Sequence, residues 1–483
     1  MNTTHFDTII VGAGISGISA AHYMQTECPH KTYTILEGRK SIGGTWDLFR
    51  YPGTRSDSDM FTFGFAFRPW TEPRIIAPRE SIMKYLVETV QEEGIEQHIR
   101  FEHKLLKAAW SSETATWSLT VLTPYAGIPQ IFTCSFLSLC MGYYDYENGY
   151  TPDFAGKDTF KGAIVHPQKW DEALDYSNKK IVVIGSGATA ITLLPSLAKK
   201  AAHVTMLQRS PTYVVAKPEI DVLAVWLNKI LPKKTAYRLN RSRNIFFQRI
   251  TYALAKAYPE ATKKILFKRL KDSLGKDFDV DKHFKPSYNP WDQRVCLVPD
   301  GDLFEVLKAK KASVVTDHIE RFTERGIQLQ SGEVLEADVI VTATGLNAKL
   351  FNNITFEIDG KPVDFSKKIA YKSVMLNNIP NMTYAFGYSN ASWTLKCDMT
   401  NQYTCRLINY MTENGYKQCM PVQNDPNLNL KPFLDFSSGY VLRTLDSLPK
   451  MGDKAPWKIE QNYFYDKKIF EKSPLDDGIL IYK

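Results

Sequence analysis

Two stretches of the chain share the same order of apolar and polar positions. Residues 7–11 (Asp-Thr-Ile-Ile-Val) predict a short buried strand, 15–26 a helix, and 33–37 a second strand with an acid at its tip. The pattern returns 173 residues later in a strand, helix and strand predicted at 180–184, 188–199 and 203–207. A strand, a glycine turn, a helix and a second strand form the first half of a dinucleotide-binding fold. The sequence therefore predicts two such units, with two nucleotides held near each other.

The remaining pattern places further elements between and after these units. Residues 104–122 and 130–140 predict β-hairpin strands around a turn at Pro124–Pro129. Helices interrupted by three prolines are predicted over 216–291, and strands return around 312–316 and 326–344. We predict an α/β fold with two Rossmann-like dinucleotide-binding domains and an inserted helical subdomain. The predicted division is 1–148 and 346–483 for the first domain, 149–215 and 292–345 for the second, and 216–291 for the helical subdomain.

Composition excludes several classes of protein. Hydrophobic residues make up 44% of the 483 residues and charged residues 23%, which excludes a mainly disordered chain. No window reaches the 18 or more apolar residues of a membrane span, and the N-terminus lacks a signal-peptide pattern. Seven scattered cysteines form no Cys-x-x-Cys pair, so we expect neither a bound metal nor a disulfide framework. We expect a cytoplasmic protein.

The net charge of +8 is concentrated in one segment. Residues 221–276 contain 14 Lys/Arg and three Asp/Glu, so this window has a net charge of +11 and the rest of the chain −3. We expect a helical subdomain that packs on the second nucleotide-binding domain and exposes a solvated charged face. An amphipathic surface for anionic lipid, giving peripheral membrane association through 221–276, is the alternative. No recognised nucleic-acid motif accompanies the charge.

The first glycine turn predicts an FAD site. Gly12, Gly14 and Gly17 follow the first strand and open the helix, so the backbone can approach a pyrophosphate at the helix N-terminus. Glu37 ends the second strand, where a ribose hydroxyl needs a carboxylate. A turn of this kind at the extreme N-terminus is typical of FAD binding.

The second glycine turn predicts an NADPH site. Its residues are Gly185, Ser186, Gly187, Ala188, Thr189 and Ala190, with alanine in place of the third glycine. Arg209 and Ser210 follow the next strand, where an NAD-selective site would have an acid. Arginine at this place suits a 2′-phosphate, so the second nucleotide is predicted to be NADPH. FAD and NADPH without a redox cysteine pair leave flavin reductases and monooxygenases.

Two longer stretches of sequence favour a monooxygenase over a flavin reductase. One is Gly43-Gly-Thr-Trp-Asp-Leu-Phe-Arg-Tyr-Pro-Gly-Thr-Arg-Ser-Asp57, and the other is Phe160-Lys-Gly-Ala-Ile-Val-His-Pro-Gln-Lys-Trp-Asp171. The second fits F-x-G-x-x-x-H-x-x-x-W-[P/D], which resembles the fingerprint of type I Baeyer–Villiger monooxygenases, a group of class B flavin-dependent monooxygenases. The resemblance covers essentially the whole chain, including Asn289–Arg294 and Tyr388–Thr394, and is strongest to the ethionamide-activating type.

The resemblance implies a chemistry and a set of site residues. In this family NADPH reduces FAD, O2 forms a C4a-peroxyflavin, and the peroxide anion attacks a ketone to give an ester or lactone. Arg294 matches the family's active-site arginine and Asp57 the aspartate that pairs with it, so these two are the predicted catalytic residues. The resemblance assigns further FAD contacts to Ser16, Thr45, Trp46, Asp47, Leu48, Asp57 and Leu105, and NADPH contacts to Arg55 and Ser56.

His166, Trp170 and Gln293 are assigned roles outside the chemical step. His166 precedes a proline in a predicted inter-domain linker, so we interpret it as a coupling residue, and we interpret Trp170 as packing; neither is predicted to be catalytic. Gln293 stands where several family members have lysine, so recognition of NADPH over NADH would rest more on Arg209 and Ser210. Parts of 50–65, 290–296 and 386–400 are expected to wall the substrate pocket.

The predicted function is an NADPH- and O2-dependent Baeyer–Villiger monooxygenase. It would act on apolar ketones, with sulfoxidation of thioethers or thioamides as a side activity. Oxygenation mainly at sulfur or nitrogen is the first alternative. A reductase that passes NADPH electrons to an acceptor without inserting oxygen is the second, and a lipid-surface binding protein with vestigial flavin sites the third. The sequence leaves the natural substrate and the oligomeric state open.

Overall fold

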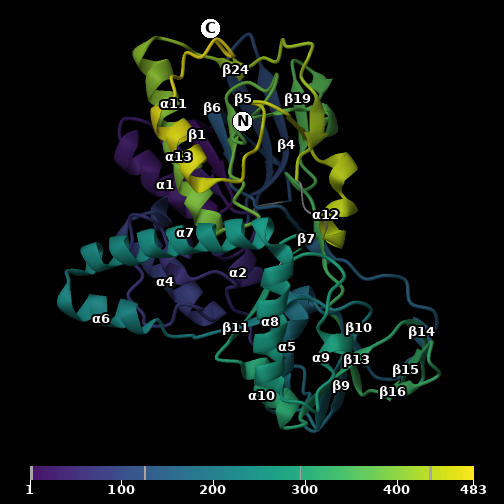
Figure 1. Ribbon diagram of the computed structural model, residues 1–483. Coiled ribbons are helices and arrows are strands. Elements are labelled where there is room, and N and C mark those ends of the chain that lie inside the picture. The colour runs from purple at the N-terminus through teal and green to yellow at the C-terminus, as the bar shows by residue number, and fades with distance from the viewer. Residues whose placement is uncertain (1–3, 125–126, 294, 435–437) are drawn as a thin grey trace.

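The structure, a computed structural model, describes residues 4–124, 127–293, 295–434 and 438–483. Its two main sheets coincide with the two predicted nucleotide-binding units. Figure 1 shows these sheets in different halves of the molecule, with the long helix α7 (Lys233–Ala257) crossing in front of the region between them. This arrangement confirms the predicted α/β class, with parallel strands at the centre of both units.

The first sheet has nine strands in the order β20-β19-β4-β5-β6-β1-β2-β3, with β23 also paired to β6. These strands are β1 Thr4–Val11, β2 Tyr33–Leu36, β3 Ile99–Arg100, β4 Lys104–Ser111, β5 Thr116–Leu122, β6 Gln130–Leu139, β19 Thr355–Ile358, β20 Lys361–Pro362 and β23 Met382–Tyr384. The β1 neighbours β2 and β6 run parallel to it, and Val11 lies opposite both Leu36 and Leu139. Three carboxyl ends therefore meet at one edge, where open α/β sheets bind ligands.

Both ends of the chain build this first unit. Helix α1 (Ile15–Glu27) packs against α11 (Trp393–Glu413), which packs against α13 (Tyr463–Lys472). Figure 1 shows these purple and yellow-green segments side by side along the first sheet. Other elements of the unit are α2 Thr45–Leu48, α3 Met60–Phe63, α4 Arg79–Glu92, α12 Gly439–Leu442, β21 Ala370–Tyr371, β22 Met375–Leu376, β24 Cys419–Pro421, β25 Leu430–Pro432, β26 Lys450–Gly452 and β27 Leu480–Tyr482.

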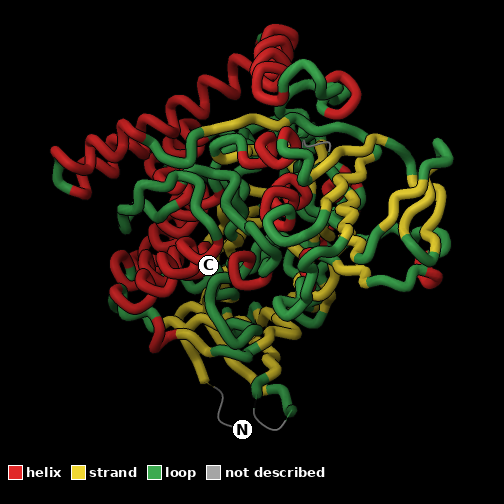
Figure 2. The backbone as a smooth tube through the Cα atoms, turned by 90° about the horizontal axis from the view of Figure 1, so that it is seen from below, coloured by secondary structure: helices red, strands yellow, loops and turns green. Residues whose placement is uncertain are grey.

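The second sheet has five parallel strands in the order β13-β10-β9-β17-β8. Its strands are β8 Ala163–Val165, β9 Lys180–Ile184, β10 His203–Gln208, β13 Ala312–Thr316 and β17 Val339–Thr342, and its helices are α5 Ala188–Leu197 and α10 Asp302–Lys308. The small sheet of β14 (Ile319–Thr323), β15 (Gly326–Leu329) and β16 (Val334–Glu336) projects from its side in both views (Figures 1 and 2). Strands β7 (Tyr144–Gly149) and β18 (Leu346–Ala348) pair where the chain crosses between the units.

The helical segment differs from expectation in where it packs. Its helices are α6 Val222–Ile230, α7 Lys233–Ala257, α8 Pro259–Leu274 and α9 Val280–His283; they begin later than residue 216 because β11 (Val214–Lys217) pairs with β12 (Cys296–Pro299). The predicted packing on the second unit describes α8, which contacts α10 and β11, whereas α7 packs against α3 of the first unit. The reason is a buried polar stripe on α7: Arg241 Nη1 donates to the carbonyls of Phe61, Thr62 and Gly64.

No helix in the described part of the chain is both long enough and apolar enough to cross a membrane.

Candidate functional site

A cavity of about 1550 Å³ lies at the carboxyl ends of β1 and β2. Its wall includes the first glycine turn, the loop after Gly43, the segment after Cys140, and Tyr388–Trp393. Parts of all three stretches expected to wall a substrate pocket contribute to it, among them Asp57, Gln293 and Trp393. The cavity therefore joins the predicted flavin site to the predicted substrate site.

The first glycine turn is shaped by close backbone contacts. Gly12 has φ +100°, and a Cβ there would lie 2.8 Å from the carbonyl oxygen of Cys140. A Cβ on Gly17 would lie 1.9 Å from the oxygen of Gly12. The first turn of α1 has no side-chain cap, so its N–H groups can bind an anion, as a pyrophosphate requires. Gly12, Gly14 and Ser16 line the cavity, whereas Gly17 is buried behind it.

Glu37 both holds this turn and lines the cavity. Its Oε2 accepts the Ala13 N–H at 2.7 Å and its Oε1 accepts the Arg39 N–H at 2.9 Å. Burial raises the pKa of this carboxyl, with the two backbone N–H groups opposing the shift. Leu105, also predicted as a flavin contact, lines the same cavity. The carboxylate thus lies at the turn, where a ribose hydroxyl would approach it.

The predicted FAD contacts in the loop after Gly43 fall into two groups. Thr45, Trp46 and Leu48 line the cavity, but Asp47 is buried away from it. Asp47 accepts hydrogen bonds from Arg39 Nη2 (2.6 Å) and Arg50 Nη2 (2.8 Å), as well as from Ser41. Burial opposes these partners, yet they hold the pKa of Asp47 below its usual value. Since Arg39 itself lines the cavity, Asp47 acts there by positioning that guanidinium.

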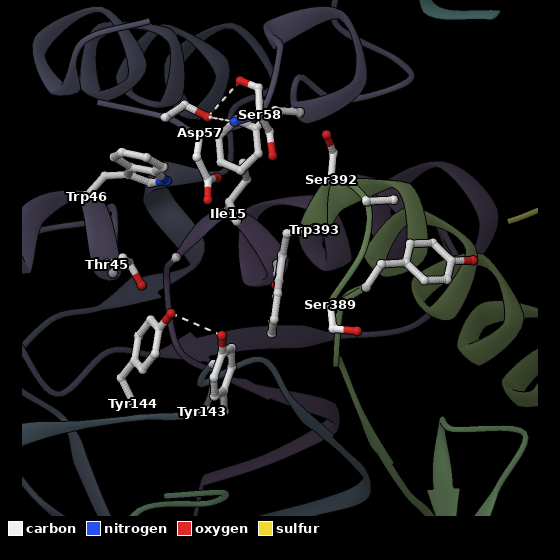
Figure 3. Close-up of a pocket in the computed structure, with 18 of the residues that line it drawn as sticks. Ile15, Thr45, Trp46, Asp57, Ser58, Tyr143, Tyr144, Ser389, Ser392 and Trp393 are labelled. Carbon is white, nitrogen blue, oxygen red and sulfur yellow. Dashed lines mark hydrogen bonds between the residues drawn. The ribbon is translucent and has the colours of Figure 1, made fainter. Parts of the chain in front are cut away.

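Asp57 lies among aromatic side chains. Figure 3 shows its carboxylate directed between Trp46 and Trp393, with Tyr143 and Tyr144 below. The ring of Tyr143 stacks on Trp393 at 5.4 Å between centroids, and the Tyr143 and Tyr144 hydroxyls are 3.0 Å apart. Ser56 also lines the cavity. Arg294, the predicted partner of Asp57, lies outside the described residues.

Trp393 ties the cavity wall to the glycine turn. Its Nε1 donates to Ser16 Oγ at 2.8 Å, and Asn401 Nδ2 donates to the Ser16 carbonyl at 3.1 Å. Both residues lie on α11, 377 and 385 positions after Ser16 in the chain. The predicted flavin contact Ser16 is therefore held in place by the C-terminal part of the chain.

Apart from Ser56, the predicted NADPH residues lie outside the cavity wall. In the described structure, those of the second glycine turn (Gly185–Ala190), Arg55, Arg209 and Ser210 are not part of it. Ser186 Oγ donates to the Ser210 carbonyl at 2.9 Å, and Gly187, Ala188, Arg209 and Ser210 are exposed. The structure thus brings the second turn and the predicted 2′-phosphate residues together at the surface.

One loop contacts both nucleotide-binding units. Gly53 packs so tightly on α5 that a Cβ would lie 2.1 Å from Ser196 Oγ. Arg55 Nη1 is 2.5 Å from Asp302 Oδ2 at the start of α10. Asp57, two residues later, faces the cavity. The loop therefore carries the predicted flavin, NADPH and catalytic residues between the two units.

Helix α7 forms a wall of the cavity, which the sequence patterns did not predict. Phe247, Gln248, Thr251, Tyr252 and Lys256 of this helix line it, with Leu266 and Arg269 of α8. Gln248 Nε2 donates to Asp59 Oδ2 at 2.5 Å and Asn244 Nδ2 to Asp59 Oδ1 at 3.0 Å. A signal was present in the sequence, because Tyr237, Arg241, Asn244 and Gln248 are spaced to lie on one face of a helix.

A buried charge pair behind the wall was also missed. Tyr388 lines the cavity, and its hydroxyl donates to Asp466 Oδ2 at 2.7 Å. Lys396 Nζ, on a side chain only 1% exposed, is 3.2 Å from the same oxygen. Asp466 lies on α13, so this C-terminal helix fixes one wall of the cavity. No pattern of residue spacing predicts such a contact.

His166 lies directly after β8 of the second sheet and contacts two segments at which the chain crosses between the units. Its Nδ1 accepts the Gln168 N–H at 3.1 Å and its Nε2 donates to the Gly345 carbonyl at 3.2 Å, which describes a neutral ring. The ring packs against Gly149, where a Cβ would lie 2.0 Å from Cε1. Burial lowers the pKa of His166 below its ordinary value of 6.5.

This histidine should make the folded protein sensitive to acid. The unfolded chain binds a proton near pH 6.5 but the folded chain only at lower pH, so the free energy of unfolding decreases as the pH falls below about 6.5. In His166→Gln, which cannot take up a proton, the thermal midpoint should fall less between pH 7.5 and 5.5. His30→Gln, at an exposed turn, is the control. Equal falls in wild type and His166→Gln would contradict the prediction.

Known proteins resemble this chain over nearly its whole length. The model of the flavin-binding monooxygenase-like family matches residues 7–387. The FAD-containing monooxygenase EthA of Mycolicibacterium smegmatis is 52% identical over 479 residues, covering 99% of this chain and 97% of that protein. The probable FAD-binding monooxygenase AlmA of Acinetobacter baylyi is 48% identical over 478 residues, covering 99% and 96%.

Solved structures share the fold at much lower identity. An open crystal structure of cyclohexanone monooxygenase has a TM-score of 0.74 at 21% identity, covering 87% of this chain and 90% of that one. A steroid monooxygenase bound to NADP has a TM-score of 0.73 at 21% identity, covering 87% and 88%. The family match, the full-length relatives and the cavity at the first glycine turn agree. The chain belongs to the flavin-binding monooxygenase-like family.

Proposed function

We propose that this protein is an NADPH- and O2-dependent Baeyer–Villiger monooxygenase that converts apolar ketones to esters or lactones through a C4a-peroxyflavin. Sulfoxidation of thioethers or thioamides is its proposed side activity. The protein is an FAD-containing, NADPH-dependent flavin monooxygenase, as its family and its relatives at about 50% identity require. The solved structures with the same fold include cyclohexanone and steroid monooxygenases, which supports the ketone class.

The observation that carries the proposal is the position of Asp57. Its carboxylate faces a cavity whose wall includes Trp46 and Trp393, beside the first glycine turn. A carboxylate there can hold the guanidinium of Arg294, the cation that the sequence motif supplies. Such a cation stabilises a developing oxyanion, and aromatic walls keep out the water that would release hydrogen peroxide.

The residues present fit both cofactors. The close backbone contacts at Gly12 and Gly17, the uncapped start of α1 and Glu37 suit the pyrophosphate and ribose of FAD. We assign NADPH to the second glycine turn with Arg209 and Ser210, and to the Arg55–Ser56 loop. When bound, FAD supplies the activation of O2, which no protein side chain can provide.

The test is stopped-flow absorbance of the NADPH-reduced enzyme mixed with oxygenated buffer. A C4a-oxygenated flavin that persists for seconds and decays when a ketone is added would support the proposal, together with an ester or lactone identified by mass spectrometry. Decay with thioethers or amines but not with ketones would replace it by oxygenation at sulfur or nitrogen. Immediate return to oxidised flavin with stoichiometric hydrogen peroxide would indicate a reductase or an uncoupled oxidase, and the roles of Asp57 and Arg294 would be withdrawn.

Asp57→Asn should separate oxygenation from flavin reduction. Without the carboxylate, the active-site cation is less well held, so we expect ester formation to fall about tenfold or more while NADPH oxidation continues and hydrogen peroxide appears. Product and peroxide are measured in the same reaction. Glu80→Gln, at an exposed position on α4, is the control and should leave the ratio of product to NADPH unchanged. An unchanged ratio in Asp57→Asn would contradict the assigned role.

A further inference from the structure

Large apolar side chains are exposed along α6 and α7. On α7 these are Leu239, Phe246, Ile250 and Leu254, whose spacing of seven, four and four residues places them on one face of the helix. On α6 they are Val222, Leu223, Trp226 and Ile230, with Val222 78% and Trp226 53% exposed. We call these eight residues the outer apolar face. Figure 1 shows α6 and α7 in front of the sheets, with α6 at the outer edge of the molecule.

Helix α7 carries apolar side chains on two sides. Its inward side buries Tyr237 and Ile245 in the core of the first unit, beside the polar residues Arg241 and Asn244 that bond to this unit. A solvated surface helix carries polar residues on its outward side. The inward residues of α7 are accounted for by these contacts, whereas its outward apolar residues are exposed.

The charged side chains on α6 and α7 are all positive. Helix α7 carries seven Lys/Arg and no Asp/Glu. Lys229, Lys233, Lys234 and Arg238, at the junction of α6 and α7, are exposed and form no ion pair with any residue in the described part of the chain. Exposed aromatic and aliphatic side chains flanked by lysine and arginine are the pattern of a surface that lies in the interface of an anionic membrane.

The cavity and the outer apolar face share the same helix. Phe247 lines the cavity and is 57% exposed, and it follows directly after Phe246 of the outer apolar face. A wall of the cavity therefore lies less than one helical turn from this face. An apolar compound dissolved in lipid could pass from one to the other with little exposure to water.

We propose that α6 and α7 dock on an anionic lipid bilayer through the outer apolar face, and that apolar substrate reaches the cavity from the lipid. The delivery of substrate rests on the function proposed above; the docking does not. Lipid fits better than a second copy of the chain, because a two-fold contact through this face would bring together two helices α7 that each carry seven Lys/Arg and no Asp/Glu.

The docking is tested by flotation of the FAD-loaded full-length enzyme with vesicles, with flavin absorbance reporting the bound fraction. We expect binding to vesicles of phosphatidylcholine with 40% phosphatidylglycerol at low salt, and much weaker binding to phosphatidylcholine alone. Trp226→Ser/Phe246→Ser/Leu254→Ser should lower the partition coefficient at least tenfold. Lys233→Glu/Lys234→Glu/Arg238→Glu should lower it by on the order of 100-fold, since each surface lysine or arginine contributes about fivefold.

Matched controls keep this result interpretable. Val334→Ser/Leu430→Ser removes comparably exposed apolar residues outside the helical segment and should bind vesicles like wild type. All variants should retain FAD and the thermal midpoint of wild type, since the changed side chains are exposed. Equal binding of wild type and the apolar triple variant would overturn the proposal. A second outcome would also overturn it: wild type forms a dimer in sedimentation velocity, the apolar triple variant does not, and neither protein binds vesicles. The outer apolar face would then be a self-association surface.

The delivery of substrate from lipid to the cavity is tested by a separate measurement. A long-chain ketone presented in anionic vesicles should be oxidised several-fold faster by wild type than by the apolar triple variant, whereas a short water-soluble ketone should be oxidised equally by both. Vesicle binding without this difference would leave docking in place and overturn delivery. Vesicle binding without oxidation of any ketone would count against the proposed function and leave docking untouched.

Discussion

Gly17→Ala is expected to yield a folded protein that contains less than about a tenth of the wild-type flavin and more than 100-fold less activity. The new methyl group would lie 1.9 Å from the carbonyl oxygen of Gly12, far inside van der Waals contact. Either the start of α1 or the turn at Gly12 must move. The Gly12 N–H is bonded to the Leu36 carbonyl at 2.8 Å, so movement there also disturbs the end of β2 and Glu37.

The ratio of absorbance at 450 nm to that at 280 nm measures the flavin content, and far-ultraviolet circular dichroism confirms folding. Gly187→Ala is the matched control, because it lies in the second glycine turn and a Cβ there has no neighbour within 4 Å in the described structure. This control should retain its flavin. Full flavin content in Gly17→Ala would show that the backbone contact does not shape the FAD site.

Arg241→Leu is expected to destabilise the protein by about 3–5 kcal/mol, the usual cost of removing one partner of a buried charge pair. Arg241 Nη1 donates to three carbonyls around the end of α3, at 2.8–3.2 Å, and Nη2 lies 3.6 Å from Asp398 Oδ2. Burial raises the pKa of Asp398, and Arg241 opposes this shift. Leucine would leave the carboxylate without its cation and the carbonyls without this donor.

Thermal unfolding of the FAD-loaded enzyme measures the effect, with an expected decrease of several degrees or more. Arg238→Leu, one turn earlier and exposed, should change the midpoint by less than about a degree. Arg241→Lys should be intermediate, because an ammonium group keeps the charge but cannot reproduce the guanidinium geometry. Equal midpoints for Arg241→Leu and Arg238→Leu would show that α7 is held by other contacts.

Local patterns were sufficient for much of the fold. The strands and helices around both glycine turns lie within a few residues of their predicted positions, because a buried parallel strand needs a continuous apolar run and a nucleotide turn needs glycine. Pro232 and Pro259 mark the starts of α7 and α8, since proline fits the beginning of a helix and not its interior. The packing of α7 on the first unit was not predicted, because a helix sequence gives its faces but not its neighbours.

The candidate site, like the fold, was predicted from the sequence only in part. Asp57, Glu37 and Trp46 were predicted from motifs and line the cavity. Asp47 belongs to the same motif, but it faces Arg39 and Arg50 instead, because side-chain direction within a short helix depends on the charges around it. The wall supplied by Phe247 and Gln248 was not predicted, since it requires α7 to cross from one unit to the other.

Residue patterns were enough to predict the family, the two nucleotide folds and the residue types that their chemistry needs, because these show in motifs of residues close in the chain. The folded structure was needed to show that Trp393 holds Ser16, that Asp466 holds Tyr388, and that α7 faces the cavity on one side and exposes Phe246 and Leu254 on the other. These contacts join segments tens to hundreds of residues apart. Their geometry follows from how whole helices pack, which no local pattern specifies.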